Sequence, residues 1–127
     1  MNSFYEAVGG EPTFRQITHE FYKQVRNDDI LHPMYPEDDL DGAEDRLCWF
    51  LMQYWGGPQT YQENRGHPRL RMRHVKFKID LAARDRWLEL FRNALATVDK
   101  ETLDDAHRAA MWDHAERVAH MLVNTPG

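Results

Sequence analysis

Apolar residues recur at intervals of three and four over most of the chain, which is the spacing of one face of an α-helix. The first of these stripes consists of Phe14, Ile17, Phe21 and Val25. Pro12 precedes it, and proline suits the first turn of a helix because the amide hydrogen that it lacks would have no partner there. The pattern predicts a helix from about Pro12 to Arg26.

Three further stripes predict three more long helices. The second ends at Gly56-Gly57-Pro58 and consists of Ala43, Leu47, Phe50, Leu51 and Tyr54. The third follows Asp80, whose carboxylate can cap a helix, and consists of Trp87, Leu88, Phe91, Leu95 and Val98. The fourth opens at Thr102 and Asp105, which resemble a capping box, and consists of Leu103, Met111, Ala115, Val118 and Leu122. No segment shows a hairpin signal, so the sequence predicts an all-α fold, with residues 1–127 forming one domain.

The stretch from Gln59 to Lys78 is weakly patterned, and we predict a loop of about 20 residues there, a length that is usually functional. Within it, Pro68 and the i, i+4 spacing of Leu70 and His74 favour a short helix that turns these two side chains inward. The flanking Arg69 and Arg73 are then predicted to point outward. A second break is predicted between Pro33 and Pro36, which bracket Met34-Tyr35 in a turn or helical corner.

Composition and charge narrow the class of protein. With 127 residues, 42% of them hydrophobic, the chain can fill a core. The net charge of -5 gives no overall field that would attract nucleic acid or an anionic membrane, and no stretch approaches the length of a membrane span. The acidic run from Glu37 to Asp45 is interpreted as solvated surface. The N-terminus shows no signal peptide, and a single cysteine, Cys48, fits a reducing compartment, so we expect a cytoplasmic protein.

Few residues carry an evident chemistry, and no catalytic residue is assigned. Motifs for nucleophilic catalysis, phosphate binding and zinc binding are absent from the sequence. Cys48 lies beside Leu47 in the predicted helix that carries the second stripe, and we expect a small buried side chain there. His107 and His114 could share a helix face and bind a divalent ion, but a solvent-exposed pair is the favoured interpretation. His74 is either an ordinary core histidine or a metal ligand, and its spacing alone favours the former.

A longer set of motifs favours the interpretation of His74 as a metal ligand. The chain contains Tyr54-Trp55-Gly56-Gly57-Pro58, then Tyr61, then Arg65-Gly66-His67-Pro68-Arg69-Leu70-Arg71-Met72-Arg73-His74. Phe4-Tyr5 with Gly9-Gly10, Met34-Tyr35-Pro36, Arg84-Asp85-Arg86-Trp87 and Leu122-Val123-Asn124 accompany them. Together these motifs resemble the truncated haemoglobins, specifically the group II branch, over essentially the whole chain. The resemblance implies a two-over-two helical sandwich that holds haem b, with His74 as the proximal ligand of the iron.

The expected pocket has two apolar walls and a cationic rim. Leu47, Phe50 and Leu51 fall on one helical face and can line the distal side, and Leu70, Met72 and Phe77 surround the proposed ligand. The same residues could equally form ordinary core. The family suggests Arg73, Arg46 and Tyr61 as partners of the haem propionates, although Arg46 could simply be solvated.

Polar groups on the distal side are expected to come from aromatic residues. Ala43 occupies the helix position at which globins commonly carry His or Gln, and it donates nothing. The resemblance implies that Tyr22, Tyr35 and Trp87 take over this role, although each could instead place its polar tip in water. Oxygen bound to ferrous haem has superoxide character, so such donors would stabilise it.

These expectations lead to a haemoglobin that binds oxygen, carbon monoxide and nitric oxide and retains oxygen too strongly to deliver it. Ligand retention, sensing or redox chemistry would then be its role. An enzyme that acts on peroxide or nitric oxide with an external reductase is the alternative, weakened by the absence of a distal imidazole at Ala43. A cofactor-free helical interaction module is the third hypothesis.

Overall fold

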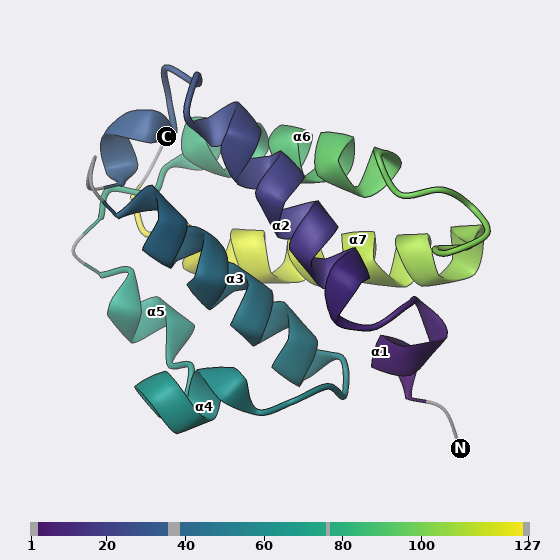
Figure 1. Ribbon diagram of the computed structural model, residues 1–127. Coiled ribbons are helices and arrows are strands. Elements are labelled where there is room, and N and C mark those ends of the chain that lie inside the picture. Colours follow the sequence, from purple (N-terminus) through teal and green to yellow (C-terminus); the bar gives the residue numbers. More distant parts are fainter. Residues whose placement is uncertain (1–2, 36–38, 76, 126–127) are drawn as a thin grey trace.

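The computed structural model describes residues 3–35, 39–75 and 77–125 (Figure 1). The described residues contain helices and no strands, as predicted. In chain order the elements are α1 (Phe4–Ala7), α2 (Glu11–Val25), the 3-10 turn η1 (His32–Met34), α3 (Leu40–Tyr54), α4 (Thr60–Arg65), α5 (Leu70–Arg73), α6 (Leu81–Ala96) and α7 (Asp105–Leu122). Pro36 of the predicted corner, together with Glu37 and Asp38 of the acidic run, lies outside the described residues.

Two helix pairs form the body of the molecule. Helix α2 packs against both α3 and α6, and α6 packs against α7, so that the α2–α3 pair crosses over the α6–α7 pair (Figure 1). The apolar stripe of α2 is fully buried, and it consists of Phe14, Ile17, Phe21 and Val25. Cys48 of α3 is buried as expected, and burial raises the pKa of its thiol to about 11. Within the part of the chain that the structure describes, no helix is long and apolar enough to cross a membrane.

The helix ends agree with the sequence at one cap and differ at another. The Asp80 carboxylate accepts a hydrogen bond of 2.9 Å from the Ala83 amide and caps α6, as predicted. The capping box expected at Thr102 is wrong. The α7 cap is Asp104, whose carboxylate accepts from the amide of His107 at 2.8 Å, whereas the amide of Thr102 donates to Asp99.

The middle segment contains more structure than the predicted loop. Helix α4 has a single buried residue, Tyr61, and therefore produces no apolar stripe. It ends at Gly66, whose φ of 75° requires the left-handed region that glycine enters most easily. The short helix expected before His74 is present as α5, and it begins after Arg69, which has a φ of 42°.

His114 contradicts the expectation of an exposed histidine pair. It lies on the same face of α7 as Met111 and Ala115, and its side chain is buried, with 5% of its surface exposed. The Tyr54 ring stacks on the imidazole with 3.7 Å between the ring centroids, and Phe50 lies next to it. Burial, reinforced by the charge of Arg117, lowers the pKa of His114 to about 4.

This buried imidazole should make the protein less stable in mild acid. The unfolded chain takes up a proton near pH 6.5, whereas the folded chain resists protonation down to about pH 4. Stability that is present above pH 6.5 is therefore lost as the pH falls, by about 2 kcal/mol at pH 5. Urea unfolding at pH 7 and pH 5 should show this loss in the native protein and a smaller one in His114→Phe. An equal loss in both proteins would contradict the assignment.

Candidate functional site

Three polar aromatic side chains meet at one end of α2. Tyr22 comes from α2, Tyr35 follows η1 and Trp87 comes from α6. The Tyr22 and Tyr35 rings meet edge to face with 5.5 Å between centroids. Phe21 touches both Tyr22 and Trp87, at 5.0 Å in each case, and Trp87 stacks on Phe91 at 5.0 Å. The structure therefore brings together the three residues that the sequence predicts as distal donors.

The surroundings keep the two tyrosine hydroxyls protonated. Burial raises the pKa of Tyr22 well above its usual value, and the neighbouring Tyr35 hydroxyl adds to the rise. Burial also raises the pKa of Tyr35, although hydrogen bonds from Tyr22 and from the Trp87 indole oppose the rise. Both hydroxyls stay protonated at neutral pH. Protonated hydroxyls and the indole N–H can each donate, so all three side chains can offer a hydrogen to a ligand.

Helix α3 supplies an apolar surface. Ala43 is buried and presents only a methyl group at the position where the sequence analysis finds no donor. Leu51 is also buried, whereas Leu47 and Phe50 are partly buried and pack against the edge of the core. The α3 residues predicted for the distal wall can therefore exclude water from this side but cannot polarise a ligand.

His74 stands directly after the last turn of α5, and its ring has one defined partner. The Nδ1 atom lies 2.7 Å from the carbonyl oxygen of Leu70. Because a carbonyl only accepts, Nδ1 carries the proton and Nε2 keeps its lone pair free to bind a metal. A backbone carbonyl that orients a histidine ligand in this way also raises the basicity of the ligand.

Apolar side chains protrude around this imidazole. Met72 is 62% exposed and Phe77 is 38% exposed, while Leu70 is partly buried. The Phe77 ring centroid lies 6.3 Å from that of His74. Large apolar side chains clustered beside a free imidazole nitrogen fit a flat apolar group whose metal needs one axial base. The chemistry of these residues thus fits haem.

The three candidates for the propionates have partners within the protein. Arg73 donates from Nε to the carbonyl of Pro68 at 2.7 Å, and its guanidinium lies 5.8 Å from the centroid of Tyr61. It therefore folds back over the segment between α4 and α5 instead of pointing outward as predicted. Arg46 pairs with Asp39 at 2.8 Å. Tyr61 is buried, and its ring meets that of Phe50 edge to face.

Sequence reasoning missed the contacts of the C-terminal tail. The Asn124 side-chain amide donates to the carbonyls of Phe77, at 2.9 Å, and His74, at 3.3 Å. Its carbonyl oxygen accepts from the amide of Ile79 at 2.9 Å. Asn124 appeared in the sequence only as part of a family motif, because contacts that span 45 to 50 positions leave no local pattern.

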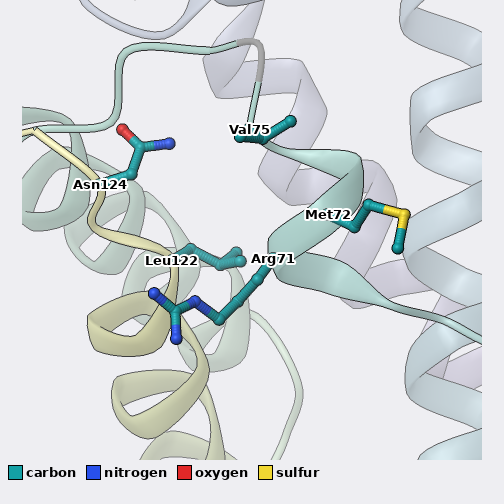
Figure 2. A pocket seen from close by; sticks show the side chains of 5 residues that line it. All are labelled: Arg71, Met72, Val75, Leu122 and Asn124. Carbon is teal, nitrogen blue, oxygen red and sulfur yellow. The ribbon is translucent and has the colours of Figure 1, made fainter.

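A cavity of about 300 Å³ lies between α5 and the end of α7 (Figure 2). Figure 2 shows Arg71 reaching toward Leu122, while Met72 points away from the end of α7. The residues that line the cavity are Arg71, Met72, Val75, Leu122 and Asn124.

Comparison with known proteins places this site in a family. The family model for bacterial-like globins matches residues 3–123. The chain belongs to the bacterial-like globins. This globin is similar to the group 2 truncated hemoglobin of Bacillus subtilis, with 36% identity over 123 residues that cover 97% of this chain and 89% of the relative.

Solved structures support the same assignment for this globin. The thermostable hemoglobin of the actinobacterium Thermobifida fusca is 49% identical and superposes with a TM-score of 0.93, covering 99% of this chain and 100% of that one. A truncated oxygen-avid haemoglobin from Bacillus subtilis gives 36% identity and a TM-score of 0.88, covering 97% of this chain and 100% of that one. The group II resemblance and the truncated globin fold are confirmed. Haem and oxygen binding follow from the family, which disfavours the cofactor-free module.

Proposed function

We propose that this globin, as one domain over residues 1–127, holds haem b through His74 and retains oxygen with hydrogen bonds from Tyr22, Tyr35 and Trp87. The observation that carries the proposal is the meeting of these three side chains at one end of α2. Haem, when bound, supplies the iron site at which a diatomic gas coordinates.

The proximal residues hold the imidazole ready for this task. The bond from Nδ1 to the Leu70 carbonyl fixes the tautomer, so that Nε2 needs no proton transfer before it binds iron. On this proposal Leu70, Met72 and Phe77 contact the proximal face, and Leu47, Phe50 and Leu51 contact the distal face. Arg73 and Tyr61, which lie against each other, would hold the propionates, and Arg46 would exchange Asp39 for a propionate.

Retention follows from the charge on the ligand. Oxygen draws electron density from iron, and donors that are already oriented stabilise that negative charge without reorganisation. Each net hydrogen bond contributes about 0.5 to 1.5 kcal/mol, so two or three slow the release of oxygen by roughly tenfold to a thousandfold. Slow release suits ligand retention, sensing or redox chemistry. The similarity to an oxygen-avid haemoglobin supports this proposal.

Turnover of peroxide or nitric oxide with an external reductase stays a prediction, as do a cytoplasmic location and carbon monoxide as a ligand.

Replacing Tyr22 or Trp87 individually with phenylalanine tests the proposal. In Tyr22→Phe and in Trp87→Phe, the bound oxygen loses one of its proposed donors, so each change should speed oxygen dissociation by roughly two- to tenfold. Stopped-flow displacement of oxygen from the reduced protein measures the rate. Dissociation rates that stay at the native value in both variants would refute the donor network.

A further inference from the structure

The tail after α7 is hydrogen-bonded to the connector between α5 and α6. The Asn124 side chain donates to the His74 and Phe77 carbonyls of this connector and accepts from the Ile79 amide. Its backbone amide donates to the Ile79 carbonyl at 2.9 Å. The amide of Thr125 donates to the same carbonyl at 3.1 Å. Side chain and backbone of one residue thus hold both ends of the segment that runs from His74 to Ile79.

We propose that Asn124 is a positioning residue for His74: by holding the His74 and Phe77 carbonyls, it sets the orientation in which the imidazole meets the iron. The inference rests on the proposed function, because it takes His74 as the proximal ligand.

Helix α5 needs such an external hold. It has four residues, and a helix of one turn is not stable by itself, because nucleation costs more than a single turn returns. Its N-terminal neighbour Arg69 is in the left-handed region and makes no side-chain cap. The Leu70 carbonyl accepts both the backbone amide of His74, at 3.1 Å, and its Nδ1. The ring orientation therefore depends on where the C-terminal end of α5 is held.

Packing provides only part of that hold on the side of α7. Helix α5 touches α7, but a pocket of about 300 Å³ opens beside this contact, and Asn124 stands at its border (Figure 2). Side chains that line such a space lack packing partners on one side. The directional hydrogen bonds of Asn124 add a second connection, between the end of α5 and the tail that follows α7.

Two substitutions and one control separate positioning from simple anchoring of the tail. Asn124→Ala removes all the side-chain contacts. Asn124→Asp keeps an acceptor for the Ile79 amide but places a negative oxygen against the His74 and Phe77 carbonyls. Thr125→Val is the control, since it removes only the 2.9 Å bond from the Thr125 hydroxyl to Asn124.

The readouts are the iron–histidine stretching band in the resonance Raman spectrum of the reduced, haem-loaded protein and the rate of haem transfer to apomyoglobin. Both Asn124 variants should move the band to lower frequency and broaden it, because a looser bond from Nδ1 to Leu70 makes the imidazole a weaker base. Haem release should become roughly tenfold faster, the lower end of what loss of an outer partner costs. Thr125→Val should leave both readouts unchanged.

An Asn124 variant that melts at a lower temperature but keeps the native band position and width would overturn the proposal, because Asn124 would then anchor only the fold. A native protein without any iron–histidine band would instead refute His74 as the ligand, which is a failure of the proposed function. If Asn124→Asp does not keep haem, Asn124→Ala decides by the same band.

Discussion

Replacing His74 with glycine should abolish stable haem binding. Among the described residues between α4 and α6, its side chain supplies a nitrogen that is free, oriented by the Leu70 carbonyl and flanked by apolar groups. Loss of an outer partner of a metal ligand typically costs about 10- to 100-fold in affinity, so removal of the ligand itself should exceed that range. The intensity of the Soret band of the purified protein and the rate of haem transfer to apomyoglobin measure the effect.

Added imidazole and a neighbouring histidine provide the controls. Free imidazole should enter the space left in His74→Gly and restore most of the Soret band. His67→Gly makes the same chemical change seven positions upstream, where the exposed imidazole only accepts from the amide of Arg69 at 3.2 Å, and it should bind haem like the native protein. A His74→Gly protein that keeps the native spectrum would show that another group binds the iron.

The apolar pattern was sufficient to predict the four long helices and the short α5, but not α1 or α4. In α2, α3, α6 and α7 most turns place an apolar residue on the core side, and this regularity is visible in the sequence. Helix α4 buries only Tyr61, so its sequence looks like a polar loop. The cap of α7 was misplaced because Thr102 and Asp104 both carry suitable oxygens, and only the course of the chain selects Asp104.

The histidines show where local reasoning ends for side chains. His114 occupies a position three residues after Met111 on the apolar face of α7, so a stricter use of helical spacing could have placed it inside. What makes its burial tolerable is the Tyr54 ring from α3, which sequence spacing does not reveal. The i, i+4 relation of Leu70 and His74 was visible in the sequence. The hydrogen bond from Asn124 to the His74 carbonyl was not, because it joins residues 50 positions apart.

Replacing Tyr22, Tyr35 and Trp87 together with phenylalanine should give the largest change in ligand kinetics. The triple variant keeps three rings in the pocket but removes every donor that the group can offer. Oxygen dissociation should therefore become roughly tenfold to a thousandfold faster than in the native protein. Each single replacement removes one donor, so Tyr35→Phe or Tyr22→Phe alone should produce only part of this change.

Carbon monoxide and a distant tyrosine make this result specific to hydrogen bonding. Bound carbon monoxide carries less negative charge than oxygen, so its dissociation rate should change much less in the triple variant. Tyr5→Phe removes a hydroxyl from a ring that stacks on Phe14, at 5.5 Å between centroids, and should leave oxygen dissociation unchanged. Equal acceleration for both gases would indicate a change in pocket volume, and it would remove the basis for oxygen retention by donors. A large change for oxygen alone requires directed protons, and of the aromatic side chains that meet at this end of α2, these three supply them.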